Sequence, residues 1–156
     1  MDFQTAVRTC LTEKYARFEG RASRSEYWWF VLACVIAGIV VSAIAGLTGL
    51  YFLQWLLTLA LLSPGVGAGY RRLQDTGKPG WYILIPTAVG LLGWLVAPGP
   101  VVMDANGMPT QMPGMFSILL GGLLAIVQLV LAVIFIWWLT RPSEPGTNAY
   151  GPPPAA

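Results

Sequence analysis

The sequence predicts an all-α integral membrane protein, built as a four-transmembrane-helix bundle with an N-terminal interfacial amphipathic helix. Of its 156 residues, 56% are hydrophobic and 10% are charged, whereas a soluble domain carries about 25% charged residues. Four apolar stretches are each long enough to cross a hydrocarbon core about 30 Å thick. The nine Lys and Arg residues all lie on one predicted side of these stretches, the pattern that the positive-inside rule associates with cytoplasmic segments.

The first predicted segment, residues 1–22, is amphipathic. Its apolar residues at helical spacing are Phe3, Val7, Cys10, Leu11, Tyr15 and Phe18. We expect a helix that covers the mouth of the bundle or lies on the leaflet as an interfacial helix, and the two placements are compatible. The apolar run that begins at Tyr27 is longer than the ~7–15 residues of a signal-peptide core, so we expect it to be retained as a span.

The membrane domain is predicted over residues 23–140. Its spans are expected at 27–47, 50–70, 81–97 and 115–139. Ser23 and Glu26 have the spacing of a capping box at the start of the first helix. Gly49 separates the first two spans, and Gly77 is placed to end the second helix as its C′ residue.

The distribution of charge orients the predicted bundle. Five basic residues precede the first span, three lie between the second and third, and one follows the fourth. The segment 98–114 carries Asp104 and no Lys or Arg. Both termini are therefore expected in the cytoplasm and the Asp104 segment outside. The tail, residues 141–156, holds five prolines and is expected to be extended and mobile.

Small residues at four-residue spacing predict close helix packing, either within one bundle or between protomers. They are Gly38, Ser42 and Gly46; Gly65 and Gly69; Gly93 and Ala97; and Ser117, Gly121 and Ala125. Gln54 and Gln128 are the strongest polar groups within the spans. Each is expected to form a hydrogen bond with a neighbouring helix.

The side chains that usually carry chemistry are scarce. The chain has no His and two Cys, and it shows no paired carboxylates, serine elbow or metal-ligand spacing. We therefore predict no catalytic residue, cofactor site or metal site. No ionisable group lies within a predicted span, which disfavours a coupled transporter. Nucleic-acid binding is disfavoured because the basic residues flank apolar spans.

Five basic residues, here called the basic rim, are predicted to gather at the ends of the first two spans. They are Arg21, Arg24, Arg71, Arg72 and Lys78. In one interpretation they set the topology and pair with Glu19, Glu26 and Asp75. In the other they bind anionic lipid headgroups or a partner protein. Attraction to anionic lipid contributes about 1 kcal/mol of binding free energy per basic residue.

Three sequence blocks resemble a known family. They are residues 18–28 (FEGRASRSEYW), 71–81 (RRLQDTGKPGW) and 146–152 (GTNAYGP). All three are similar to segments of the bacterial family catalogued as domain of unknown function 805. Relatives often carry His where this chain has Gln74, so a chemistry assigned to that position does not carry over. The resemblance implies a small multi-pass protein of the bacterial inner (plasma) membrane, without a known activity.

Three functions are weighed on this basis. The leading hypothesis is a non-enzymatic membrane protein whose basic rim binds anionic lipid or a partner protein. The alternative is an oligomeric pore or permeation factor, motivated by the glycine stripes, which also predict a homo-oligomer or a partner membrane protein. An enzyme that acts on lipid phosphate comes third, because the catalytic side chains are missing.

Overall fold

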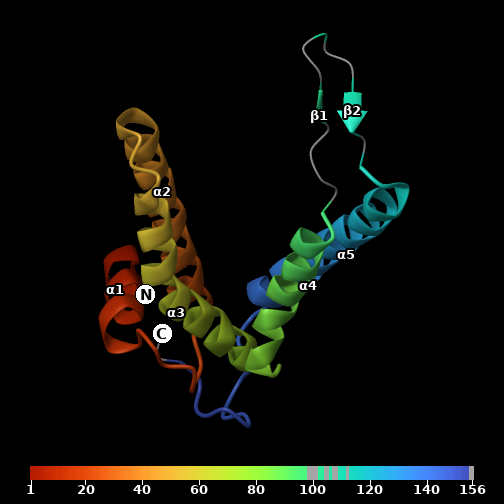
Figure 1. The fold of residues 1–156 in the computed structure, drawn as a ribbon. Helices are drawn as coiled ribbons and strands as arrows, with labels where there is room; N and C mark the ends of the chain where they lie inside the picture. The colour runs from red at the N-terminus through yellow and green to blue at the C-terminus, as the bar shows by residue number, and fades with distance from the viewer. Residues whose placement is uncertain (98–101, 104–105, 107–108, 112, 155–156) are drawn as a thin grey trace. The chain divides into compact units, whose positions relative to one another are not determined.

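The structure of the chain is a computed structural model that describes residues 1–97, 102–103, 106, 109–111 and 113–154. It is mainly helical (Figure 1). The elements in chain order are α1 (Phe3–Arg8), the π-helical turn η1 (Thr9–Glu13), α2 (Arg24–Thr48), α3 (Phe52–Asp75), the 3₁₀ turn η2 (Gly80–Ile83), α4 (Leu84–Leu95), β1 (Val102–Met103), β2 (Pro109–Gln111) and α5 (Met115–Thr140). Among the described residues, α2, α3 and α5 are long and apolar enough to cross a membrane.

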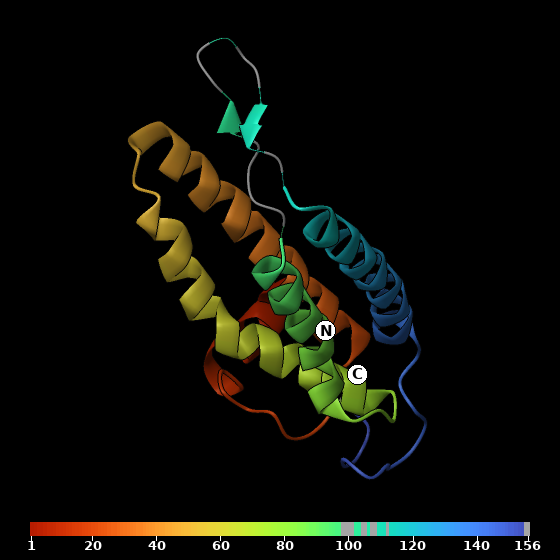
Figure 2. The ribbon, with the colours of Figure 1, turned by 45° about the vertical axis from the view of Figure 1, so that its right-hand side comes forward.

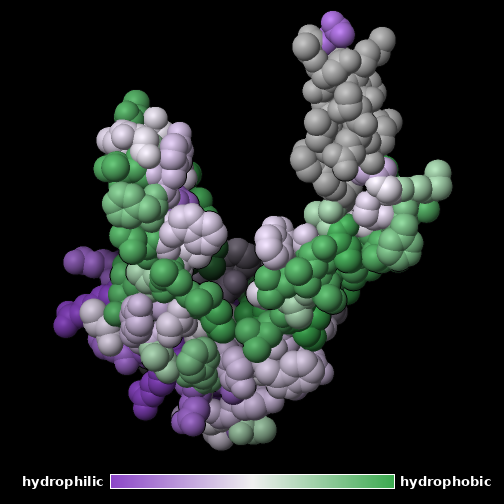
Figure 3. Space-filling view, in the orientation of Figure 1, coloured by the Kyte–Doolittle hydropathy of each residue, from purple (hydrophilic) through white to green (hydrophobic). Residues whose placement is uncertain are grey.

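The chain divides into two compact units. The first comprises Met1–Ile83 together with Trp138–Ala156, and the second comprises Leu84–Trp137. In the first unit α2 and α3 lie side by side in both ribbon views (Figures 1 and 2). Hydrophobic side chains cover much of these two helices, whereas hydrophilic side chains gather around α1 (Figure 3).

The ends of α2 follow from local sequence. Ser23 is the N-cap, and its hydroxyl oxygen accepts a hydrogen bond from the Glu26 backbone N–H at 3.1 Å, as the capping spacing predicts. The Glu26 carboxylate binds Lys14 and Arg71. At the other end Gly49 adopts φ 74°, a left-handed conformation that suits glycine and ends the helix.

The contact between α2 and α3 contains both polar and apolar side chains. The Ser42 hydroxyl donates to Oε1 of Gln54 at 3.1 Å, so the predicted interhelical hydrogen bond of Gln54 is confirmed. Nearer the arginine-rich end, Phe30 and Ala68 are buried together with Cys10 of the preceding segment. The first unit therefore has a small apolar core beside its polar end.

Helix α3 continues through Pro64, and a tyrosine compensates for the missing backbone donor. Proline has no N–H, so the carbonyl four residues earlier, that of Ala60, loses its helical partner. The Tyr15 hydroxyl donates to this carbonyl at 2.7 Å. The Ser63 hydroxyl in turn donates to the carbonyl of Tyr15 at 3.1 Å. The N-terminal segment is thereby attached to α3 at the proline.

The N-terminal segment is helical over a shorter range than its amphipathic spacing predicts. α1 ends at Arg8 and η1 at Glu13, and residues 14–22 are not helical. The carbonyls of Lys14 and Arg17 accept hydrogen bonds from the Arg71 guanidinium. These tertiary contacts turn the chain away from the helical path that its apolar spacing favours.

The second unit contains α4, α5 and a hairpin between them. β1 and β2 are antiparallel, with Val102 opposite Gln111 and Met103 opposite Pro109. These short strands were not predicted from the sequence. Asp104, expected on the outer side, lies outside the described residues.

The C-terminal segment, residues 141–152, differs most from its prediction. We expected it to be mobile, but its backbone is held by hydrogen bonds to the rest of the first unit. The Glu144 N–H donates to the Asp75 carbonyl at 3.0 Å, and Asn148 and Gly151 form an antiparallel bridge. The prolines exclude regular structure, but their carbonyls and those of their neighbours still accept hydrogen bonds.

Candidate functional site

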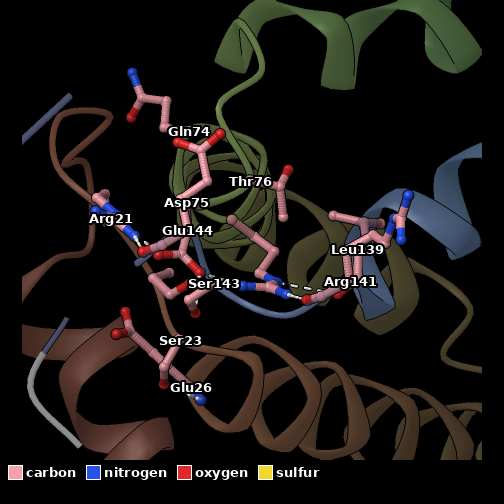
Figure 4. A network of polar contacts seen from close by, with 12 residues as sticks. Arg21, Ser23, Glu26, Gln74, Asp75, Thr76, Leu139, Arg141, Ser143 and Glu144 are labelled. Atoms are coloured by element: carbon pink, nitrogen blue, oxygen red, sulfur yellow. Dashed lines mark hydrogen bonds and ion pairs between the residues drawn. The ribbon is translucent and has the colours of Figure 1, made fainter. Parts of the chain in front are cut away.

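Three segments that are distant in sequence meet in one polar network of the first unit (Figure 4). They are the approach to α2 with its first turn, the last turn of α3, and the C-terminal segment. Each of these segments contains one of the three blocks that carry the family resemblance. The blocks therefore assemble into a single site.

Asp75 is at the centre of what we call the Asp75 cluster, formed with Arg21, Arg72 and Ser143. Arg21 Nε donates to Asp75 Oδ1 at 2.9 Å, and Arg72 and the Ser143 hydroxyl both donate to Oδ2. The side chains of Asp75, Arg21 and Arg72 are fully buried. Buried charges require such partners, because each has lost its hydration.

The guanidinium of Arg21 also binds the C-terminal segment. Its two terminal nitrogens donate to the backbone carbonyls of Gly146 and Glu144, both at 2.6 Å. A planar guanidinium has five N–H donors in a fixed arrangement, so one arginine can bind a carboxylate and several backbone carbonyls at the same time. Arg21 thus links the approach to α2 with the last turn of α3 and the tail.

Arg72 makes a similar set of contacts at the end of α5. Its Nε donates to the Leu139 carbonyl at 3.0 Å, and a terminal nitrogen donates to the Arg141 carbonyl. The last carbonyls of a helix lack intrahelical partners. Arg72 therefore satisfies this helix end and positions the chain that leaves it.

Two amides extend the network. The Asn148 side chain donates to the Gln74 carbonyl at 3.0 Å and to the Glu144 carboxylate at 2.9 Å. The Gln74 side chain faces the carbonyls of Phe18 and Gly20, and an amide nitrogen placed toward them donates at 3.1 and 2.7 Å. The Gln74 side chain therefore contacts backbone.

A second ion-pair group, here called the Glu26 cluster, comprises Lys14, Glu26 and Arg71. The Lys14 ammonium lies 3.1 Å from one carboxylate oxygen and the Arg71 guanidinium 3.3 Å from the other. The side chains of Glu26 and Arg71 are almost fully buried. Among the described residues, Arg71 Nε has no hydrogen-bond acceptor.

Cys10 lies against the Glu26 cluster. Its sulfur is 3.9 Å from a terminal nitrogen of Arg71. Burial raises the pKa of the Cys10 thiol to about 11, and the negative charge of Glu26 acts in the same direction. The thiol is therefore protonated at neutral pH and serves as a small apolar residue.

Each of the two clusters contains two basic side chains and one carboxylate. Backbone carbonyls accept further hydrogen bonds from the arginines, but carbonyls carry no formal charge. The ion-paired side chains of each cluster thus carry two positive charges and one negative charge, and the Glu144 carboxylate, bound by Asn148, is a further negative charge of the network around Asp75. The arrangement suits attraction of an anion to this end of the molecule.

Arg24 and Lys78 of the basic rim are less buried than its three other members. Arg24 is exposed and lines a groove of about 380 Å³ with Trp28 and Trp29. Lys78 is half-buried, and its ammonium lies 5.3 Å from the centroid of the Trp138 ring. Basic and tryptophan side chains together are typical of the lipid headgroup region.

Several residues of this site were not named by sequence reasoning. Lys14 was counted as a topological charge, and Ser143, Glu144 and Asn148 were placed in a mobile tail. Glu19, expected as a partner of the arginines, is exposed and takes part in none of the ion pairs of the described residues. The resemblance of the tail block was the one signal that pointed to its involvement.

The candidate chemistry of the described residues is electrostatic. Within them, no group of three or more Cys, Asp or Glu side chains is arranged to hold a metal ion. The two buried carboxylates accept hydrogen bonds from basic side chains. The arrangement can stabilise a local structure and attract a negative ligand.

Apolar helices of spanning length with a charged network at one end define an integral membrane protein of the helical class. The chain belongs to the DUF805 family, described as a protein family of unknown function, which matches residues 15–152. This range includes all three blocks and the Asp75 cluster, together with Glu26 and Arg71 of the Glu26 cluster.

Curated relatives include two inner membrane proteins of Escherichia coli strain K12. The chain is 39% identical to the inner membrane protein YhaI over 87 residues, which cover 54% of this chain and 72% of YhaI. It is 29% identical to the inner membrane protein YhaH over 90 residues, which cover 54% of this chain and 74% of YhaH. No solved structure matches the chain.

Proposed function

We propose that the chain crosses the inner membrane four times, with both termini in the cytoplasm. Arg21, which precedes α2, and the carbonyl of Gly146, which follows α5, are joined by a hydrogen bond. Residues before the first span and after the last one therefore share a side of the membrane. This supports an even number of crossings, so α4 would also cross the membrane, in addition to α2, α3 and α5.

The length of the segment that ends in α4 supports the same topology. Gly80–Leu95 is a shorter apolar helical segment, with a four-residue 3₁₀ turn followed by twelve α-helical residues. At about 2.0 and 1.5 Å per residue it extends about 26 Å, close to a core of about 30 Å. The α1–η1 segment, with Phe3 packed edge-on against Trp29, would lie at the interface.

For the function, we propose a non-enzymatic membrane protein whose basic rim binds anionic lipid headgroups. The excess of basic side chains over carboxylates in both clusters is the observation that carries this proposal. Arg24 and Lys78 would contact the headgroup, and Arg21, Arg71 and Arg72 would add a positive field from within the protein. A partner protein with an acidic surface is the other ligand that this rim suits.

Lipid retention by the purified protein tests the proposal. Native mass spectrometry in detergent, with phosphatidylglycerol and phosphatidylcholine offered together, should show preferential retention of the anionic lipid. In the variant with Arg24→Gln and Lys78→Gln, retention should fall about fivefold per residue, the equivalent of about 1 kcal/mol each.

The control for that experiment is Arg8→Gln, which removes an exposed basic residue of α1 that is outside the rim. It should leave the preference for phosphatidylglycerol unchanged. Equal retention of both lipids by the wild-type protein would overturn the lipid proposal. Loss of a co-purifying protein from the double variant, with lipid retention intact, would favour the partner protein.

A second candidate function is an oligomeric pore or permeation factor. A Cβ atom placed on Gly38, Gly46 or Gly65 would meet no atom within 4 Å. These glycines are therefore not required by the packing of the described first unit, and they suit contact with another helix. Flux of ions and small solutes from liposomes containing the purified protein tests this function, and absence of flux at every oligomeric state would exclude it.

A further inference from the structure

A polar cleft of about 300 Å³, here called the Lys78 cleft, lies between the turn after α3 and the start of the C-terminal segment. Thr76 and Lys78 line it from the turn, and Arg141 and Glu144 line it from the C-terminal segment; Thr76, Arg141 and Glu144 are labelled in Figure 4. All of its lining residues belong to the first unit. The Glu144 N–H donates to the Asp75 carbonyl at 3.0 Å, so the two walls of the cleft are joined directly.

Lys78 brings to this cleft a positive charge that no carboxylate contacts. Its ammonium lies 3.5 Å from the Thr76 carbonyl and 5.3 Å from the centroid of the Trp138 ring. Neither group carries a formal charge, and Lys78 takes part in none of the ion pairs of the described residues. The Glu144 carboxylate accepts instead from the Asn148 amide at 2.9 Å. Because an ammonium group has three donors, Lys78 retains the capacity to bind an anionic ligand.

Arg141 adds a second positive charge from the opposite wall. Its backbone carbonyl accepts a hydrogen bond from the buried Arg72 guanidinium, which positions the residue at the cleft without using its side chain. A guanidinium has five N–H donors, so it can bind more than one group. The cleft therefore has two basic side chains and one carboxylate, that of Glu144.

Two helix ends near the cleft act against an anion, but they are weaker than the basic side chains. The C-terminus of a helix corresponds to about half a negative unit charge. The Leu73 carbonyl, near the end of α3, already accepts from the Thr76 hydroxyl at 2.9 Å, and the Leu139 carbonyl of α5 accepts from Arg72 at 3.0 Å. The cleft and the adjoining Asp75 cluster together contain four basic side chains and two carboxylates, an excess larger than the two helix ends offset.

The second unit is not a source of the missing negative charge. Residues 84–137 contain one charged side chain, that of Asp104. The topology proposed above places Asp104 on the opposite side of the membrane from residues 141–152. A negative ligand from outside the chain is therefore the expected partner of Lys78.

We propose that the Lys78 cleft binds a phosphate group, carried by a lipid headgroup or by a soluble phosphate ester. A phosphate presents acceptor oxygens on several sides, so the ammonium of Lys78 and the guanidinium of Arg141 can bind it from the two walls. The volume is at the lower end of the range of about 300–1,000 Å³ for ligand pockets, which suits a headgroup and not a whole lipid. For a lipid headgroup the proposal rests on the anionic-lipid binding proposed above, to which it adds Arg141.

The first experiment uses a soluble probe. Glycerol 3-phosphate is titrated into the full chain in a neutral detergent, and calorimetry gives the dissociation constant. Lys78→Gln and Arg141→Gln should each raise this constant about fivefold, the equivalent of about 1 kcal/mol per basic residue. Arg141→Lys keeps the charge and should restore most of the binding. Arg8→Gln, which removes an exposed basic residue far from the cleft in sequence, is the control and should leave the constant unchanged.

The second experiment uses a substitution whose effect has the opposite sign. Glu144→Gln keeps an acceptor for the Asn148 amide but removes the negative charge from the cleft. It should lower the dissociation constant of glycerol 3-phosphate about twofold to threefold, because one repulsive charge is lost. A purely structural role of Glu144 predicts weaker or unchanged binding, so tighter binding identifies the electrostatic effect.

The third experiment distinguishes the two sources of the phosphate group. Retention of phosphatidylglycerol by Arg141→Gln is measured by native mass spectrometry, as for the basic rim. A fall in retention indicates a lipid headgroup. Unchanged retention together with weaker binding of glycerol 3-phosphate indicates a soluble phosphate ester. Both results support the cleft as a phosphate site.

The proposal is overturned if Arg141→Gln and Lys78→Gln change neither the binding of glycerol 3-phosphate nor the retention of phosphatidylglycerol. If Arg24→Gln still lowers retention in that case, lipid binding by the basic rim stands without the cleft. Conversely, binding of glycerol 3-phosphate that depends on Arg141, in a wild-type protein without a preference for phosphatidylglycerol, removes the rim proposal and leaves the cleft. If Arg141→Gln does not fold, Lys78→Gln and Glu144→Gln decide.

Discussion

At the scale of single residues, Asp75 contributes most to the polar end of the first unit. Its carboxylate accepts from Arg21, Arg72 and Ser143, and its backbone carbonyl accepts from Glu144. Opposite charges are thus paired where water is excluded. Removing the carboxylate leaves two buried guanidinium groups without a counter-charge, which is more costly than a lost surface ion pair.

We expect Asp75→Asn to lower the free energy of unfolding by about 3 kcal/mol. The amide keeps the size of the side chain but not its charge. Thermal or denaturant unfolding in detergent, followed by circular dichroism, measures the change. Glu19→Gln removes an exposed carboxylate and should change stability by less than about 0.5 kcal/mol. Equal effects of the two variants would contradict a central role for Asp75.

Tyr15 offers a second test at the residue scale. Its hydroxyl donates to the Ala60 carbonyl that Pro64 leaves without a helical donor. Tyr15→Phe should therefore destabilise the protein by about 1 kcal/mol. In a Pro64→Ala background the backbone N–H is restored, so the same substitution should cost clearly less. A double-mutant cycle in detergent gives the coupling, and strictly additive effects would argue against this compensation.

The role of a residue could be predicted from the sequence where its partners are close to it along the chain. Ser23 and Gly77 were predictable because caps follow from short sequence patterns and backbone conformation. Glu26 and Asp75 were expected near arginines. The pairing of Glu26 with Lys14, twelve residues earlier, was not predicted. Helical spacing applies only within a helix, and the residues between these two are largely non-helical.

At the scale of elements, the turn after α3 is held by both backbone conformation and a contact with the tail. Gly77 has φ 72°, a left-handed conformation that other residues adopt at a cost. A Cβ on Gly77 would also collide with the carboxylate of Glu144. The turn therefore depends on a glycine for two separate reasons.

Gly77→Ala should lower the free energy of unfolding by about 2 kcal/mol, from backbone strain together with the collision. In a Glu144→Ala background the collision is removed, so the remaining effect should approach about 1 kcal/mol, the cost of the left-handed conformation alone. Unfolding of the four variants in detergent separates the two contributions. If Gly77→Ala lowered the free energy of unfolding equally in both backgrounds, the Glu144 carboxylate would not be placed against this turn.

The C-terminal segment shows why some elements could not be predicted. Its prolines and glycines predict a segment without helix or strand, and its described residues form neither. Mobility does not follow from that composition, since Arg21 and Arg72 bind its carbonyls. Backbone groups are common to all residues, so sequence gives little indication of which carbonyls a buried arginine will select.

At the scale of the whole molecule, the expected four-span topology depends on the distribution of charge and on the contact between Arg21, before α2, and Gly146, after α5. The helices α2, α3 and α5 were predictable from length and apolar composition. The division of the chain into two units and the β1–β2 hairpin were not predicted, because apolar periodicity describes individual helices and not their grouping.

Thiol labelling of intact and permeabilised cells tests the topology. Asp104→Cys should react with a membrane-impermeant reagent from outside, whereas Thr147→Cys should react only after permeabilisation. The wild-type chain is the control for its own thiols, Cys10 and Cys34. Labelling of Thr147→Cys in intact cells would place the tail on the outer side and would invert the proposed threading.

The binding of the tail by Arg21 has a consequence for biogenesis. Arg21 leaves the ribosome well over a hundred residues before Gly146, whose carbonyl it eventually binds. Throughout that interval its guanidinium lacks acceptors that exist only in the last part of the polypeptide. Nascent chains arrested before residue 140 should consequently be recognised by membrane proteases as incomplete, and completion of translation should be the step that makes the protein resistant.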